Sequence, residues 1–182
     1  MSLLIRLLLL TGLSAALLGG CSSGSSGPIS ENLPDLVIQE DELPPLYEQM
    51  RGEFIDNEAG YLVEWQAPDK NRTVTSIVRR MPTSKDASDF VNARNQEYLK
   101  EGFSNDRAKE LGNINYFVSQ FTDTGIEYRS VVAEGRYVSE IMVAGDKTVF
   151  GECYVYTRYV YHHLKSNAPT PDTGASIETA GN

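Results

Sequence analysis

Residues 114–143 have the sequence INYFVSQFTDTGIEYRSVVAEGRYVSEIMV, and this stretch decides the fold. It holds three runs of strand-forming residues, at 114–121, 126–133 and 137–143, with only a few turn residues between them. A glycine in each turn, Gly125 and Gly135, supplies the positive φ that tight hairpins need. Because short connections make neighbouring strands antiparallel, the stretch predicts a three-stranded meander.

The residues upstream of the meander add a further hairpin. Apolar and polar residues alternate at 61–66, and residues 73–81 are rich in β-branched side chains, so we expect two strands around a turn at 69–71. Residues 36–38 are a candidate short edge strand. Residues 47–55 are a weaker strand candidate beyond the break at Pro44 and Pro45. The upstream region therefore contributes two to four strands.

A helix is predicted between the hairpin and the meander. Pro82 ends the preceding strand, and Thr83 or Ser84 caps a helix that has Asp86 in its first turn. Gly102 is a natural stop just past the end of this helix. Its apolar face consists of Ala87, Phe90, Val91 and Tyr98.

Residues 148–164 fit both a helix and a strand. Apolar residues recur there at helical spacing and leave Thr157 on a different face; they are Val149, Cys153, Tyr156, Val160 and Leu164. Residues 153–157, in contrast, are strand-forming types. A strand would place Thr157 on the same side as Cys153, and it would place Val160 on the opposite side. The length of the segment and a cap at Asp146 or Thr148 favour the helix.

This order of elements predicts an α+β fold. The expected architecture is an antiparallel sheet of five to seven strands with two helices packed on it, a two-layer sandwich.

The N-terminus has the build of an export signal. Arg6 precedes an uncharged apolar run that ends in Leu18, Gly19 and Gly20, and Cys21 follows directly. The run is about 12 residues long, too short to cross a bilayer, which takes about 20. This pattern resembles the signal of prokaryotic lipoproteins, in which an aliphatic residue and then small residues precede the cysteine.

The resemblance implies that the Cys21 thiol carries lipid, so that the membrane is a partner through the N-terminal lipid. The residue after the cysteine is Ser22 and not an aspartate, and by the family's sorting rules this implies that the protein goes to the outer membrane in a cell with two membranes. In a cell with a single membrane, it implies the outer face of that membrane. We expect a signal peptide at 1–20, a flexible Gly/Ser tether at 21–34, a single α+β domain at 35–165 and a disordered polar tail at 166–182. The domain loosely resembles small α+β domains of uncharacterised prokaryotic surface lipoproteins.

Charge and cysteine usage exclude some partners. The chain has 16 basic and 25 acidic residues, and loss of Arg6 with the signal leaves 15 basic against 25 acidic residues, a net charge of −10. A field of this sign disfavours nucleic acid and anionic lipid headgroups.

If Cys21 carries lipid, Cys153 has no partner within the chain. We expect a buried free thiol there, the alternative being a reactive thiol or an intermolecular disulfide.

The sequence holds no motif for catalysis, a metal or a cofactor, and we expect none of the three. Adjacent helical residues point about 100° apart. His162 and His163 are therefore expected at the surface near the helix end, rather than as metal ligands with Glu140 or Glu152. No nucleophile elbow, Walker loop or dinucleotide fingerprint is present. A hydrolase with unrecognised carboxylates stays an alternative.

The last segment carries a candidate binding surface of Tyr154, Arg158 and Tyr161, because tyrosine and arginine are enriched at binding hot spots. The alternative is that these rings pack on the sheet. With the anchor, the sequence predicts a lipid-anchored, non-enzymatic protein of the cell envelope that binds a protein, peptide or small ligand. Its partner would be another envelope protein or a ligand. A structural component of envelope assembly is the remaining alternative.

Overall fold

The computed structural model describes residues 33–106, 111–146 and 150–167. Its centre is a seven-stranded sheet in the order β1-β2-β3-β7-β6-β5-β4, with every neighbouring pair antiparallel. The strands are β1 (Glu48–Ile55), β2 (Gly60–Gln66), β3 (Arg72–Arg80), β4 (Ser104–Asn105), β5 (Ile114–Thr122), β6 (Gly125–Glu134) and β7 (Tyr137–Gly145). The predicted α+β class with an antiparallel sheet and two helices is confirmed.

The sheet joins two antiparallel units. The meander β5-β6-β7 forms as predicted. Its last strand, β7, pairs with β3, and this pairing joins the unit β1-β2-β3 to the meander in one sheet. The helix α1 (Ser84–Lys100) makes the crossover between the two units. The Thr83 side chain accepts a hydrogen bond from the backbone N–H of Asp86, which confirms Thr83 as its N-cap.

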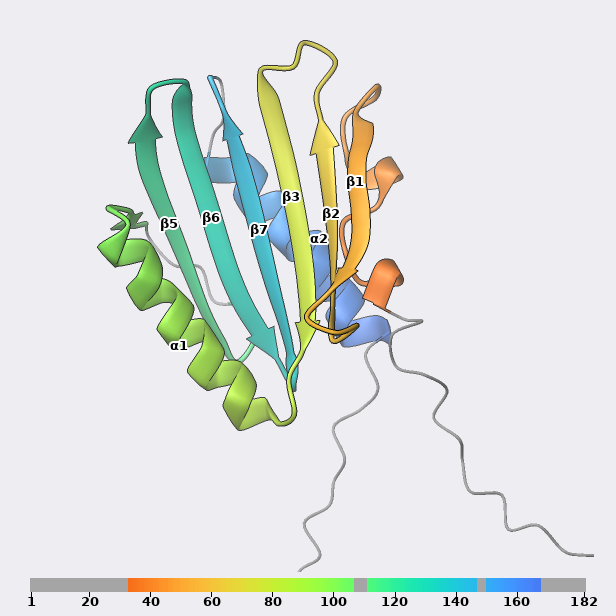
Figure 1. Cartoon of the computed structure of the whole chain (residues 1–182), viewed down its shortest axis with the longest axis vertical. Coiled ribbons are helices and arrows are strands. Elements are labelled where there is room, and N and C mark those ends of the chain that lie inside the picture. Colours follow the sequence, from red (N-terminus) through yellow and green to blue (C-terminus); the bar gives the residue numbers. More distant parts are fainter. Residues whose placement is uncertain (1–32, 107–110, 147–149, 168–182) are drawn as a thin grey trace, which may run out of the picture.

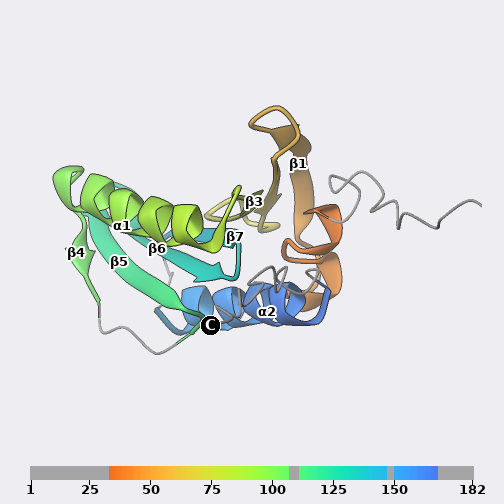
Figure 2. The same cartoon turned by 90° about the horizontal axis from the view of Figure 1, so that it is seen from below.

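The two helices lie on opposite faces of the sheet (Figures 1 and 2). α1 packs over β5, β6 and β7, while α2 (Phe150–Asn167) packs over β6 and β7 from the other side. The central strands carry apolar side chains on both faces of the sheet. Val131 and Val138 face α1, and Val132 and Ile141 face α2. The sheet is therefore the middle of three layers, where the sequence predicted two.

Residues 148–164 form the helix that the sequence favoured, within the described range that starts at Phe150. Cys153, Tyr156, Val160 and Leu164 are buried as predicted, whereas Val149 lies outside the described residues. Thr157 is also fully buried, so its placement on a different face was wrong. Its hydroxyl donates to the Cys153 carbonyl oxygen at 2.6 Å and lies 2.5 Å from the Ser130 hydroxyl, which satisfies both hydroxyls under the helix.

The segment before β1 covers the part of the sheet that α2 leaves open. Leu33, Leu36 and Ile38 are buried against β2, β3 and α2. The backbone N–H of Ile38 donates to the Ser76 hydroxyl at 3.2 Å, which is not a strand pairing. The expected edge strand at 36–38 was therefore wrong: these residues are apolar because a loop buries them. A 3-10 turn, η2 (Glu40–Glu42), follows.

The antiparallel register sorts the loops into two ends. The residues before β1 and the β2–β3 and β5–β6 turns lie at the upper end of the sheet in Figure 1, together with the end of β7. The first described residues and the last turn of α2 lie toward the lower end (Figure 1).

Candidate functional site

Three adjoining pockets lie along the upper end of the sheet. The largest, about 520 Å³, is formed by the segment from Gln39 to Tyr47. The second, about 330 Å³, shares Pro44, Pro45 and Tyr47 with the first. The third, about 280 Å³, shares Arg72 and Asp146 with the second. Because neighbouring pockets share lining residues, they adjoin one another across the loops, and we call the three shallow pockets together the loop groove.

Arg72 is the central cation of the loop groove, and its charge is already matched. Its Nη1 atom lies 2.7 Å from Oε1 of Glu152 in the first turn of α2, and both side chains are half-buried. Burial raises the pKa of the neighbouring Tyr47 hydroxyl, an effect that Arg72 partly offsets. Tyr47 therefore stays neutral, and Arg72 braces the groove rather than offering a free positive charge to an anion.

Carboxylates line the groove on both sides of Arg72. Glu40 and Asp41 line the first pocket, and Asp69 and Asp146 line the second. Asp69 accepts a hydrogen bond from the backbone N–H of Asn71 at 3.2 Å, which fixes the β2–β3 turn. Within the described part of the chain, Glu40, Asp41 and Asp146 belong to none of the ion pairs. The lining of the groove thus combines carboxylates with the rings of three prolines, Pro44, Pro45 and Pro68.

Leu46 adds an exposed apolar side chain to the largest pocket. It is 78% exposed, and its φ of 73° lies in the left-handed region, which is unusual for a bulky residue. Such strain concentrates at ligand clamps and binding loops, where the surrounding structure holds it in place. The strained backbone turns an apolar side chain outward beside Pro44 and Pro45.

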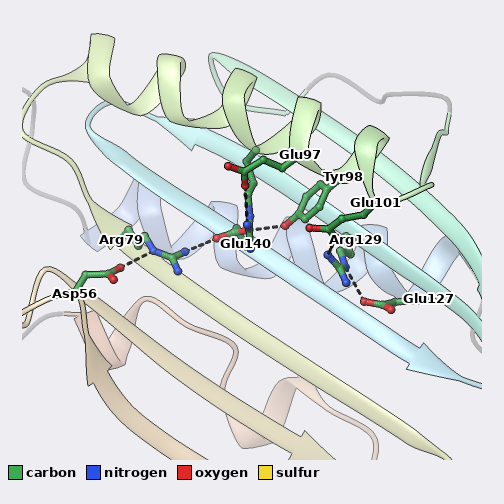
Figure 3. A network of polar contacts seen from close by, with 9 residues as sticks. Asp56, Arg79, Glu97, Tyr98, Glu101, Glu127, Arg129 and Glu140 are labelled. Atoms are coloured by element: carbon green, nitrogen blue, oxygen red, sulfur yellow. Dashed lines mark hydrogen bonds and ion pairs between the residues drawn. The ribbon is translucent and has the colours of Figure 1, made fainter.

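A second polar cluster lies between α1 and the sheet (Figure 3). The Glu140 carboxylate on β7 is completely buried, and Arg79 of β3 pairs with its Oε1 atom. Its Oε2 atom accepts from Arg94 Nε at 2.7 Å and from the Tyr98 hydroxyl at 2.5 Å. Both oxygens of Glu140 are therefore occupied.

The arginines of this cluster reach outward to more exposed carboxylates. Arg79 Nε lies 2.7 Å from Asp56, and Arg94 Nη1 lies 2.9 Å from Glu97 (Figure 3). Burial, followed by the nearby Glu140 charge, raises the pKa of Tyr98, so this hydroxyl stays a donor. Because Glu140 is completely buried and both of its oxygens are engaged, a substrate cannot reach this carboxylate, and the cluster acts as a clamp that holds α1 on the sheet.

The predicted tyrosine surface lies on α2, away from the loop groove. Tyr154 is half-buried, with ring centroids 5.9 Å from Phe117 and 6.4 Å from Phe150. Arg158 is exposed, and the half-buried Tyr161 ring has Lys165 Nζ at 5.5 Å from its centroid. The three residues follow one stripe of the helix without lining any of the three pockets, and their role in binding stays a prediction.

The histidines differ from each other. His162 is exposed, as expected, but His163 is half-buried. Its Nε2 lies 3.0 Å from Glu42, and its Nδ1 lies 3.2 Å from the Val37 carbonyl oxygen. The expected surface role of His163 was wrong, because the segment before β1 folds back over the end of α2. The hydrogen bond that the His163 ring donates to the Glu42 carboxylate raises the pKa of His163.

The remaining sequence candidates are placed as follows. Cys153 is a free, fully buried thiol, as predicted, and burial raises its pKa to about 12. Cys21 lies outside the described residues, and its lipidation stays a prediction. In the described ranges no three His, Cys, Asp or Glu side chains come together to hold a metal ion.

Sequence reasoning missed both the loop groove and the Glu140 clamp. Pro44 and Pro45 were interpreted only as a strand break, although two prolines beside Leu46 also signal a rigid, exposed apolar loop. Glu140 is the charged residue of the central strand β7, which was a usable sign of a buried ion cluster. Its partners Arg79 and Arg94 come from distant elements, and spacing in the sequence does not reveal them.

Comparisons with known proteins add a fold but no family. No protein-family model and no curated protein matches the chain. Neither α1 nor α2 in the described residues is long and apolar enough to cross a membrane. Among solved structures, the chain is similar to the extracellular domain of PknH from Mycobacterium tuberculosis, at 11% sequence identity and a TM-score of 0.58. The match covers 75% of this chain and 96% of that domain, and at this identity it shows a shared fold alone.

Proposed function

We propose that this chain is a lipid-anchored, non-enzymatic binding module of the cell envelope, which holds a protein or peptide partner in the loop groove. The observation that carries the proposal is the adjacency of the three pockets, formed by loops at one end of a rigid sheet. Binding sites are commonly built in this way, from loops that a stable scaffold positions.

The position of the chain's N-terminal side supports this arrangement. Residues 22–32 would connect a lipid at Cys21 to the first described residues, which lie toward the lower end of the sheet (Figure 1). The groove is lined by the segment before β1, the β2–β3 turn and the end of β7, which lie at the other end. A flexible tether of this kind would hold the domain off the bilayer and leave the groove accessible to a partner. The similar solved structure is an extracellular domain, which supports a location outside the cytoplasm.

A shallow groove suits a polypeptide better than a small metabolite. Small-molecule sites usually enclose most of the ligand surface, whereas peptides are bound along open, partly apolar grooves. Leu46 at 78% exposure and the prolines beside it supply apolar area for such a contact. The half-buried ion pair of Arg72 and Glu152 keeps the centre of the groove rigid.

Cysteine accessibility in intact cells tests the proposal. Leu46→Cys places a thiol in the groove, and Glu58→Cys places one in the β1–β2 turn at the opposite end; native Cys153 is buried. With a membrane-impermeant maleimide, Leu46→Cys should react much more slowly in cells than in the purified full chain, whereas Glu58→Cys should react equally in both. Equal reactivity of Leu46→Cys in cells and in the purified chain would show that nothing covers the groove.

A further inference from the structure

The lining of the loop groove also selects the class of its partner. We infer that the groove takes an extended cationic peptide segment, one whose lysine or arginine side chains alternate with small or apolar residues. This inference rests on the proposed function, because it assigns a ligand class to the same groove.

The charges of the lining residues carry the argument. Four carboxylates line the groove, at Glu40, Asp41, Asp69 and Asp146, against two cations, Lys70 and Arg72. The Arg72 charge is matched by Glu152 at 2.7 Å. An anionic ligand such as a phosphate or an acidic sugar would therefore meet repulsion along most of the groove. A cationic ligand would meet a favourable field along most of it.

The apolar lining restricts the ligand further. Pro44 and Pro45 line both of the first two pockets, Pro68 lines the second, and the buried Leu43 and Ala67 add apolar area. Lysine and arginine side chains have apolar stems and charged ends, so the stems can lie on proline rings while the ends reach carboxylates. A compact inorganic cation would leave this apolar area exposed. Each of the first two pockets combines two carboxylates with apolar residues, which suits a peptide that carries both cationic and apolar side chains along an extended backbone.

The chain's own C-terminal residues do not have this chemistry. After Lys165 the sequence contains Asp172 and Glu178 and no lysine or arginine. Like charges would oppose its docking in the groove, and the ligand is therefore expected to be another molecule.

Peptide titration of the purified full chain tests the inference. The probe is a short peptide of alternating lysine and alanine, with matched peptides in which glutamine or glutamate replaces lysine. We expect the lysine peptide to bind more tightly than the glutamine peptide, and the glutamate peptide to show no binding. Affinity for the lysine peptide should fall as salt is raised through the range in which exposed charges are screened.

Matched variants locate the contact. Asp69→Asn with Asp146→Asn removes two charges from the groove. Glu58→Gln, in the β1–β2 turn, with Glu134→Gln, at the end of β6, removes two charges from the other end of the sheet. Because each exposed charge pair contributes modestly, the first double variant should weaken lysine-peptide binding by about three- to tenfold, and the second by less than about twofold.

Two outcomes would overturn the inference. One is equal loss in both double variants, which would mean that the net charge of the protein alone attracts the peptide. The other is equal binding of the lysine and glutamine peptides, or binding of neither. If Leu46→Cys is protected in cells while the lysine peptide fails to bind, the proposed function stands and the cationic class is wrong.

Discussion

Replacement of Glu140 by glutamine is expected to destabilise the fold strongly, although it changes one atom. The carboxylate is completely buried and contacts Arg79, Arg94 and Tyr98. Glutamine keeps the shape of the side chain but loses the charge, and its amide group would face one of the arginines as a competing donor. Two guanidinium groups that are only 18% and 30% exposed would then lose their shared counterion.

The size of the effect follows from these contacts. Removing one partner from a buried ion pair costs roughly 3–5 kcal/mol. Arg79 keeps Asp56 and Arg94 keeps Glu97, so the loss belongs at the lower end, about 3 kcal/mol. For a domain of this size this corresponds to a fall in melting temperature of roughly 10 °C.

Urea unfolding, followed by fluorescence of Trp65, measures the effect, since this buried residue is the sole tryptophan of the chain. Glu97→Gln is the matched control. It removes a carboxylate of the same cluster whose side chain is 54% exposed, and should cost less than about 1 kcal/mol. If Glu140→Gln costs no more than Glu97→Gln, the clamp does not hold α1 on the sheet and the reasoning fails.

Three further predictions concern α2 and the cysteines. Val160→Asp buries a charge under the helix and should prevent folding or lower the melting temperature by more than about 10 °C. Arg158 is exposed, so Arg158→Ala should shift the melting temperature by no more than a few degrees. Similar melting temperatures of the two variants would contradict the buried face of α2. His163 has a pKa raised by Glu42, so the stability it adds should be fully present below about pH 6.5 and disappear as pH rises through its folded-state pKa. Urea unfolding of wild type and His163→Gln across pH checks this, and a difference that grows with pH would have the wrong sign. Cells labelled with a clickable fatty acid should label wild type and not Cys21→Ser, and equal labelling of both would rule out lipidation at Cys21.

The elements with strong local signals could be predicted from the sequence. The turns at Gly125 and Gly135 set the meander, and the Thr83 cap set the start of α1. Both glycines have positive φ in the structure, as the hairpins require. These signals act within a few residues, so a single sequence contains all the information that they need.

The parts that depend on distant contacts could not be predicted. Residues 36–38 have the composition of a strand, but their burial comes from α2 and β3. Thr157 is a polar residue inside a helix, and only the Ser130 hydroxyl on β6 explains why it is buried. The two-residue strand β4 pairs with β5 through Ser104 and Asn105, which carry no strand signal. In each case the partner is far along the chain, and periodicity does not identify it.

The candidate site follows the same division. Cys21 and the tyrosines of α2 are predictions from local patterns, and both stay predictions. The loop groove draws its walls from residues near 44, 69 and 146, which meet only because the sheet brings the ends of β2 and β7 and the start of β3 together. A groove made by topology leaves no spacing in the sequence.

Hydrogen exchange of the full chain, in native membranes and after purification in detergent, tests the central claim most directly. If a partner occupies the loop groove, the amides of residues 39–47 and 69–73 should exchange more slowly in membranes than in the purified chain. The turns at 56–59 and 134–136, at the other end of the sheet, should exchange equally in both. Protection of those lower turns instead, or identical exchange everywhere, would contradict the account.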